Sequence, residues 1–234
     1  MNLYWQDDND SPELYRVPDD IVDILFKVRC PALPIDHHQA LSDAVQQALP
    51  WIVTEEDAAI PAIHVAESGN GWMRPEDPDN EVLYLSRRTR MALRIPGNRL
   101  DDARNLTGAV LDIDGALLEV GESSTRPLSK LTTIFCRYLA SSQADDEAAF
   151  MRSAHEQLSA LGIHPKKMLT GKLHRITSHQ GPILTRSLLL ANLDIEESIK
   201  LQQKGLGPCR KLGCGIFLPH KGIDPVRKGH DATA

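Results

Sequence analysis

The first half of the chain switches between the alternating hydrophobic pattern of strands and the wider spacing of helices. Residues 21–30 alternate apolar with polar side chains and predict a strand. Residues 36–49 carry apolar side chains at helical spacing behind Asp36, and predict a helix that begins there. The expected order of this half is β-α-β-β-α-β, over residues 21–30, 36–49, 60–68, 81–96, 98–108 and 109–121. Its last segment is predicted to be a hairpin-like pair of strands.

The second half repeats this order of elements, although the two halves share no visible sequence similarity. A strand is predicted over 128–142, followed by a helix over 145–162 with an acidic first turn and a glycine at its end. A pair of strands, a capped helix and a final strand are expected at 165–193, 194–205 and 214–220. Two successive units of this order predict an α+β protein made of two tandem ferredoxin-like (RRM-like, βαββαβ) folds, with a glycine-rich loop near the C-terminus.

A chain of 234 residues is long enough to bury two such cores. We expect an acidic leader, an N-terminal ferredoxin-like domain, a C-terminal ferredoxin-like domain and a tail, over residues 1–20, 21–122, 123–223 and 224–234. No apolar run approaches the roughly 20 residues that span a bilayer, and the N-terminus is acidic rather than basic and apolar. We therefore expect a cytoplasmic protein without membrane contact.

Charge is unevenly distributed along the chain. Residues 164–234 hold 12 Lys and Arg against 5 Asp and Glu, whereas the remainder holds 14 against 27. A basic C-terminal third predicts a local surface for a polyanion, and a solvated basic face is the alternative. Of the cysteines, at positions 30, 136, 209 and 214, only Cys209 and Cys214 are close, and a C-x4-C pair without a second nearby pair is a poor zinc site. All four are expected to be free thiols.

Three short strings match parts of known catalytic motifs. "DHH" at 36–38 matches a metal phosphoesterase signature, but no further set of Asp and His metal ligands is obvious, which leaves a phosphoesterase as an alternative from another class of enzyme. "DIDG" at 112–115 matches a phosphatase string, but Asp-Gly also suits a hairpin turn, which is the preferred interpretation. The stretch "GLGPCRKLGCGIF" at 205–217 fits neither a P-loop nor a dinucleotide-binding loop, where Arg210 replaces the third glycine.

The glycines of the 205–217 stretch fit a different use. Small residues let two backbones approach closely, and they leave N–H groups that can face phosphates. Arg210 and Lys211, at the tip of the loop, would add charge-assisted contacts.

A G-x-G…G-x-G loop after the last helix of a second ferredoxin-like unit resembles the loop of the CRISPR-associated repeat-processing endoribonucleases, which belong to the RAMP superfamily. "PIDHHQALSDAV" resembles the first helix of that family, and "AIHVAES" resembles the segment that carries the catalytic histidine in many members. Residues 66–90 are similar to the subtype found in myxobacterial-type CRISPR systems. The resemblance covers most of residues 21–223.

The resemblance implies metal-independent cleavage of precursor CRISPR RNA within its repeat, beside a stem-loop, without a cofactor or a bound metal. The ribose 2′-OH attacks the adjacent phosphate and leaves a 2′,3′-cyclic phosphate and a 5′-OH. Histidine suits either proton transfer because its ordinary pKa is about 6.5. We expect His64 as the main acid or base, with His37 as its rival. Ser68 is a candidate hydrogen-bond donor to the scissile phosphate, and His38 is expected to be exposed.

The expected RNA contacts are basic residues of two hairpins and the residues of the glycine loop: Arg87, Arg88, Arg90, Lys166, Lys167, Lys172, Arg175, Lys204, Gly205, Gly207, Arg210, Lys211, Gly213 and Gly215. Low aromatic content, 5%, favours binding of a stem over stacking on single-stranded bases. Other subunits of a type I CRISPR effector complex are expected as further partners.

Two alternatives share the predicted fold. A catalytically inactive RNA-binding subunit of an effector complex would have every binding feature and would lack cleavage. A structural ferredoxin-like protein would bind RNA no better than the net charge of −6 suggests.

Overall fold

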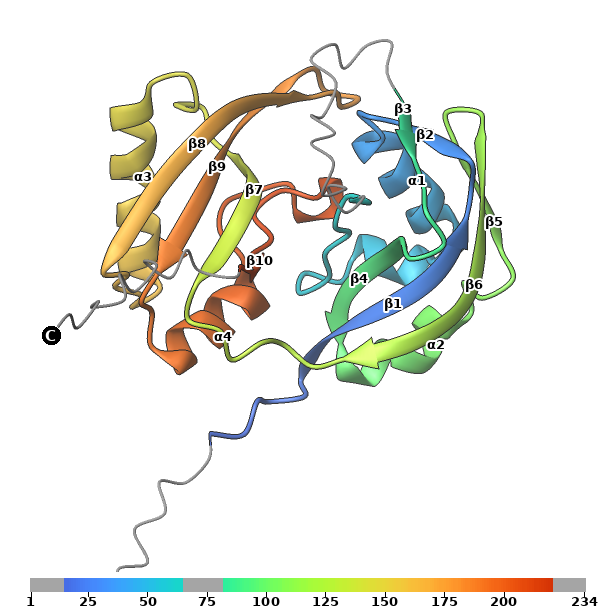
Figure 1. The fold of residues 1–234 in the computed structure, drawn as a ribbon, viewed down its shortest axis with the longest axis horizontal. Coiled ribbons are helices and arrows are strands. Elements are labelled where there is room, and N and C mark those ends of the chain that lie inside the picture. Colours follow the sequence, from blue (N-terminus) through green and yellow to red (C-terminus); the bar gives the residue numbers. More distant parts are fainter. Residues whose placement is uncertain (1–14, 65–81, 221–234) are drawn as a thin grey trace, which may run out of the picture.

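The computed structural model describes residues 15–64 and 82–220, whose elements form two four-stranded antiparallel sheets side by side (Figure 1). The first sheet has the strand order β4-β1-β6-β5 and the second has the order β10-β7-β9-β8. These sheets confirm the expected α+β class with ferredoxin-like folds. In the described part of the chain, no helix has the length and apolar character needed to cross a membrane.

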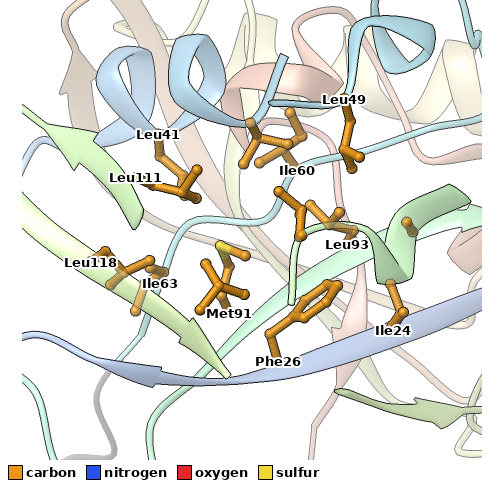
Figure 2. Packing of buried hydrophobic residues seen from close by; sticks show 14 of the residues in the cluster. Ile24, Phe26, Leu41, Leu49, Ile60, Ile63, Met91, Leu93, Leu111 and Leu118 are labelled. Carbon is orange, nitrogen blue, oxygen red and sulfur yellow. The ribbon is translucent and has the colours of Figure 1, made fainter. Parts of the chain in front are cut away.

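The first sheet buries one face beneath the helix α1 (His38–Ala48). Ile24 and Phe26 alternate onto this face from one strand, and Met91 and Leu93 oppose them from the next. Leu41 of α1 packs on the same cluster, which Figure 2 shows from close by. The strands are β1 (Ile21–Arg29), β4 (Arg90–Pro96), β5 (Val110–Ile113) and β6 (Ala116–Arg126). This half also contains η1 (Pro50–Val53), η2 (Gly97–Arg99), α2 (Leu100–Arg104) and a separate ribbon of β2 (Ala32–Pro34) and β3 (Val82–Tyr84).

The first half follows the expected order only in part. The hairpin β5–β6 follows α2 as expected, but the one strand expected over 81–96 is broken into β3 and β4. A turn causes the break, because the Ser86 N–H donates to Thr89 Oγ1 at 3.1 Å and the Thr89 N–H donates to the Ser86 carbonyl at 2.9 Å. No strand forms over residues 60–64, where Pro61 has no N–H to donate.

The second half follows the expected β-α-β-β-α-β order. Its elements are β7 (Ile134–Ala140), α3 (Glu147–Ala160), β8 (Lys167–Ile176), β9 (Ile183–Ala191), α4 (Ile195–Lys204), η3 (Arg210–Leu212) and β10 (Leu218–Pro219). Asp194 and Glu197 form a reciprocal capping box at the start of α4, as the sequence predicts. Side chains of α3 and α4 pack in one cluster with Cys136, Leu188 and Leu190, so both helices cover the same face of this sheet.

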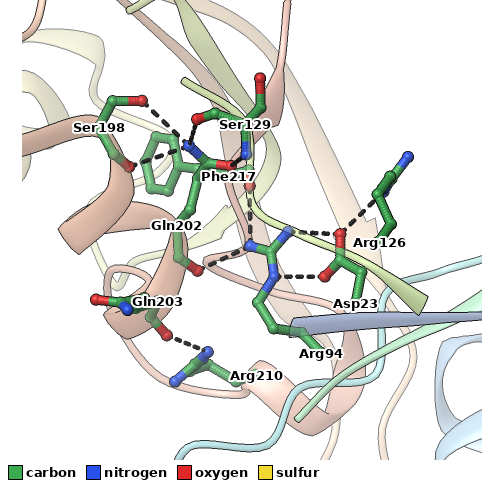
Figure 3. A network of polar contacts seen from close by, with 9 residues as sticks. All are labelled: Asp23, Arg94, Arg126, Ser129, Ser198, Gln202, Gln203, Arg210 and Phe217. Atoms are coloured by element: carbon green, nitrogen blue, oxygen red, sulfur yellow. Dashed lines mark hydrogen bonds and ion pairs between the residues drawn. The ribbon is translucent and has the colours of Figure 1, made fainter. Parts of the chain in front are cut away.

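Arg94 of β4 joins the two halves from a fully buried position, 1% exposed. Its Nε and Nη2 donate to the two carboxylate oxygens of Asp23, at 2.8 and 3.3 Å. Its Nη1 donates to the carbonyls of Gln202 and Phe217 in the second half, at 2.8 and 3.0 Å (Figure 3). Burial by itself would raise the pKa of Asp23, but the Arg94 charge and the hydrogen bonds from Arg94 and Arg126 hold that pKa below its ordinary value. A charged joint therefore connects the first sheet to α4 and to the residue before β10.

The tip of the β8–β9 hairpin makes a second contact between the halves, over α1 (Figure 1). The Thr177 N–H donates to Asp36 Oδ2 at 2.7 Å, and the His179 N–H donates to Gln39 Oε1 at 3.2 Å. The His179 ring adds a 2.7 Å contact with Asp43 Oδ2. These contacts hold the second sheet close to the start of α1.

Candidate functional site

His37 is buried, 1% exposed, and both of its ring nitrogens bond to the backbone. The Ile63 N–H donates to His37 Nε2 at 2.9 Å, so in this bond Nε2 carries the lone pair and Nδ1 carries the hydrogen. His37 Nδ1 lies 2.9 Å from the Pro34 carbonyl and 3.1 Å from that of Ile35. His37 therefore anchors the segment that leads into His64, which differs from the proton-transfer role considered for it from the sequence.

His64 comes directly after this anchor and is exposed. Its ring lies 6.2 Å from that of Tyr138 on β7, at an interplanar angle of 27°. The segment before it is fixed at two further points, because Ala59 pairs with Arg94 on β4 and the Ile60 N–H donates to the Arg210 carbonyl at 3.2 Å. The backbone leading to His64 is thus held by both halves of the protein.

His38 is buried, 4% exposed, whereas the sequence suggested an exposed position. Its Nδ1 donates to the Leu212 carbonyl of the glycine loop at 2.8 Å, which places the lone pair of the neutral ring at Nε2. The Tyr138 ring meets it edge-on, with centroids 4.6 Å apart. His174 of β8 meets Tyr138 from another side at 5.3 Å. Four ring side chains from both halves, His38, His64, Tyr138 and His174, therefore form one group, called here the ring cluster.

Tyr138 and His174 reach the ring cluster through two β-bulges. The pairing of β7 with β9 shifts register across 136–139, and that of β8 with β9 shifts across 170–173. Both shifts lie opposite the same residue of β9, Ser187. Each bulge adds one residue to its strand, so the side chains in and beyond it lie on the opposite face from the one that regular alternation would give them. Tyr138 and His174 consequently lie on the face that α3 and α4 leave uncovered.

Arg186 braces the bulge in β8. Its Nη1 donates to the Gly171 carbonyl at 2.9 Å, and its Nε donates to the Ala144 carbonyl at 2.8 Å. A Cβ at Gly171 would overlap Ser187 Oγ, so a larger residue there would require the Ser187 hydroxyl to rotate away. The bulge that aims His174 is therefore built into the packing of the sheet.

The glycine loop, residues 205–217, is part of the scaffold of the ring cluster. Its N–H groups bond within the protein: the Leu206 N–H donates to the Gly215 carbonyl at 3.0 Å, and the Gly215 N–H donates to the Tyr138 carbonyl at 2.8 Å. Gly215 has φ +67°, and a Cβ there would overlap the Leu206 carbonyl oxygen. The N–H groups of Gly213 and Cys214 also bond to loop carbonyls. The close backbone approach therefore uses the N–H groups of Leu206, Gly213, Cys214 and Gly215, which the sequence suggested would face phosphates.

The cations of the glycine loop and of the adjoining helix end also bind protein groups. Arg210 Nη2 donates to the Gln203 carbonyl at 2.8 Å, and Lys211 Nζ donates to the Val53 carbonyl at 2.6 Å. Burial and the nearby charge of Arg94 lower the pKa of Arg210 to about 10. At the end of α4, Lys204 pairs with Asp57 at 3.1 Å. The Arg210 bond lies within the second half, whereas the Lys211 and Lys204 contacts join the loop and the end of α4 to the first half, which is a structural role that the sequence did not indicate.

The other predicted RNA contacts lie mostly on exposed surface. Arg87 and Arg88 are exposed at the turn between β3 and β4, whereas Arg90 folds back to bond the Arg87 and Thr89 carbonyls at 2.9 and 2.8 Å. The exposed cations at and along β8, an edge strand of the second sheet, are Lys166, Lys167, Lys172 and Arg175.

Ser68, the predicted hydrogen-bond donor to the scissile phosphate, lies outside the described residues. Within residues 15–64 and 82–220, no three His, Cys, Asp or Glu side chains form a group suited to a metal ion.

These observations define an α+β protein with two antiparallel sheets and a cluster of histidine and tyrosine rings between its halves. A family model described as Cas6 Crispr matches residues 22–222. The chain is 33% identical over 199 residues to the CRISPR-associated endonuclease Cas6 of Myxococcus xanthus (strain DK1622). The aligned region covers 85% of this chain and 81% of that protein. The chain belongs to the Cas6 family, which confirms the resemblance found in the sequence.

Solved structures agree with this assignment at the level of the fold. A structure described as CRISPR associated protein Cas6 has a TM-score of 0.58 at 11% identity and covers 86% of this chain and 100% of its own. A Cas6-related protein from Pyrococcus furiosus has a TM-score of 0.59 at 12% identity and covers 84% of this chain and 97% of its own.

Proposed function

We propose that this protein is an endoribonuclease that cuts precursor CRISPR RNA within the repeat, beside a stem-loop. The observation that carries the proposal is the ring cluster, in which residues far apart in sequence supply three histidines and a tyrosine at one place. Membership of the Cas6 family supports it, and the Myxococcus xanthus relative is itself described as an endonuclease.

The proposed chemistry is an internal transfer of the phosphate that needs only proton donors and acceptors. The 2′-oxygen forms a bond to the adjacent phosphorus while the bond from phosphorus to the 5′-oxygen breaks. A base takes the proton of the 2′-OH, and an acid gives a proton to the leaving 5′-oxygen, which yields a 2′,3′-cyclic phosphate and a 5′-OH. One well-placed proton-transfer group contributes on the order of 10²–10⁴ in rate.

The geometry distributes roles among the histidines. His64 is exposed next to Tyr138, so RNA can reach it, and we assign it proton transfer. His37 and His38 are buried and bonded to the backbone, and we assign His37 to positioning. Tyr138 is itself buried, 4% exposed, whereas His174 is partly exposed, so His174 is then the group that can contact the phosphate or exchange the second proton.

The exposed cations provide a surface for the RNA backbone. Arg87 and Arg88 extend from the turn before β4, and Lys166, Lys167, Lys172 and Arg175 extend from β8. Each phosphate that these residues neutralise releases counterions, so the affinity should fall steeply with salt, with a slope of about −0.7 to −0.9 per phosphate on a log–log plot.

The test is cleavage of an end-labelled repeat hairpin in excess EDTA by the wild type and by His64→Ala, Tyr138→Phe and His174→Ala. We expect cleavage by the wild type to survive EDTA, and the His64→Ala rate to fall at least about 100-fold with unchanged RNA affinity. His155→Ala is the matched control, because His155 is exposed on α3 away from the ring cluster.

A hairpin with a 2′-deoxy nucleotide at the cut should bind normally and remain intact, because the attacking group is missing. Cleavage of this RNA, or cleavage that EDTA abolishes, would rule out the proposed mechanism and favour a metal phosphoesterase. Tight, salt-sensitive binding without cleavage of any repeat RNA would instead identify a catalytically inactive RNA-binding subunit.

A further inference from the structure

The uncovered face of the second sheet carries a row of apolar side chains that crosses all four strands. Register pairs Leu218 of β10 with Phe135 of β7, Phe135 with Leu189 of β9, and Leu189 with Leu169 of β8. We call these four residues the apolar ladder. The row is three strand spacings of about 4.8 Å wide, which is about 14 Å.

The apolar ladder belongs to neither core of the second half. Strand alternation places its members opposite the residues that pack beneath α3 and α4, such as Leu188 and Leu190. Leu169 is 61% exposed, and the other three members are partly exposed. His220 lies at one end, with its ring 5.8 Å from that of Phe135.

The chemistry around the apolar ladder favours a polyanion with apolar parts. The four strands of this sheet contain no Asp or Glu and five Lys or Arg, of which Arg186 lies on the helix-covered face, because it pairs in register with the core residue Leu139. Lys167 is exposed two residues from Leu169 and therefore shares its face. The ring cluster occupies the same face, because the bulge at 137–138 turns Tyr138 onto it, three residues, or about 10 Å, from Phe135 along β7.

We infer that the apolar ladder binds the unpaired bases of the RNA next to the cleavage position. An RNA strand that leaves the ring cluster along this face would place its bases on Phe135 and the leucines and its phosphates near Lys167. Sheet faces of this shape hold two or three unstacked bases in RNA-recognition modules. This inference rests on the proposed function for the identity of the RNA, and it adds a single-strand site to the stem-binding surface that low aromatic content favoured.

The test uses two RNAs: a short unstructured pyrimidine strand, and the repeat hairpin with or without its unpaired flanking nucleotides. Affinities are measured by fluorescence anisotropy for the wild type, Phe135→Ala and Leu169→Asp. Stacking on one aromatic corresponds to about a 5- to 150-fold change in affinity per base. We expect at least about tenfold weaker binding of the unstructured strand and of the flanked hairpin by both variants, and little change for the hairpin without flanks.

Leu117→Asp is the matched control. Leu117 of β6 is also 61% exposed and lies on a sheet, so this variant adds the same charge at the same exposure elsewhere. Equal effects of Leu169→Asp and Leu117→Asp would overturn the inference, as would unchanged binding of the unstructured strand by both ladder variants. Weaker self-association of the Phe135→Ala variant in sedimentation, with RNA affinity unchanged, would also overturn it and identify a protein contact.

Failure of the inference is distinct from failure of the proposed function. Wild-type protein that cleaves no repeat but binds the unstructured strand through Phe135 would refute the proposed cleavage and retain the apolar ladder as an RNA site. Wild-type protein that cleaves the repeat while the ladder variants bind both RNAs normally would retain the function and remove the ladder.

Discussion

Replacing Arg94 with methionine should destabilise the whole protein, because this side chain joins the two halves from a buried position. Methionine keeps much of the volume but removes the charge and all four hydrogen bonds. Among residues 15–64 and 82–220, Asp23, 3% exposed, would keep Arg126 as its one ion-pair partner. The carbonyls of Gln202 and Phe217 would lose their buried donor.

The magnitude follows from these losses. Removing one partner of a buried ion pair costs about 3–5 kcal/mol, because the other charge stays buried. Each orphaned carbonyl adds about 1 kcal/mol or more, and the remaining Arg126 contact relieves part of the cost at Asp23. We expect a loss of about 4 kcal/mol, a large part of the roughly 5–15 kcal/mol that stabilises a typical domain.

Urea unfolding followed by circular dichroism measures this loss. With a slope of about 2 kcal/mol per molar urea, the midpoint should fall by about 2 M. The transition should also broaden or split, since the halves lose a joint that makes them unfold together. Lys27→Met is the control: Lys27 is on the same strand as Asp23, but its ion pair with Glu122 is exposed, so the midpoint should stay in place.

A double-mutant cycle with Asp23→Asn separates the pair from its surroundings. Asp23→Asn and Arg94→Met should be less harmful together than their separate losses suggest, by about 0.5–3 kcal/mol, because the second change removes a partner that is already lost. An Arg94→Met variant within about 1 kcal/mol of the wild type, or strict additivity in the cycle, would refute this account of the joint.

Three further outcomes are expected. The free energy of unfolding should fall in acid, and it should fall less in the Asp23→Asn variant. Burial raises the pKa of Asp23, but its interactions with Arg94 and Arg126 lower that pKa by more, so the folded-state pKa lies below the ordinary value of 3.8. The stability that ionised Asp23 contributes is therefore full above pH 3.8 and is lost as the pH falls through the folded-state pKa. Gly215→Ala should lose more than about 4 kcal/mol in urea unfolding, because its Cβ meets the Leu206 carbonyl, whereas Gly162→Ala, with the same φ of +67° and open space, should lose roughly 1–2 kcal/mol. Burial raises the pKa of the Cys209 thiol, so a thiol reagent should label it slowly at pH 8 and much faster above its ordinary value of 9.0, as followed by mass spectrometry.

Much of the second half could be predicted from the sequence, because its signals are local. The acidic cap at Asp194, the helical spacing after it and the strand alternation over 183–191 all depend on neighbouring residues, and the structure has them where they were expected. In the first half, the break at Ser86 and Thr89 depends on side-chain hydrogen bonds that compete with the strand, and the alternation of apolar residues carries no sign of them.

The ring cluster was only partly visible in the sequence. His64 could be singled out, but the partners that define the other histidines come from distant segments: Ile63 donates to His37, and the Leu212 carbonyl accepts from His38. Tyr138 follows Cys136 at strand spacing, so alternation alone would place it in the helix-covered core. Only the register shift reveals its true face, and register is a property of paired strands.

The two bulges opposite Ser187 give β7 and β8 one residue each more than regular pairing with β9 needs. Deleting Arg137, or one residue from 171–172, would therefore restore regular pairing, and Tyr138 and His174 would keep the faces that they have now. A deletion in a regularly paired part of a strand has no extra residue to remove, so it reverses the side chains on one side of it. In the descent of this chain, therefore, single-residue deletions at the two bulges would be tolerated more readily than deletions in the regularly paired strand β9.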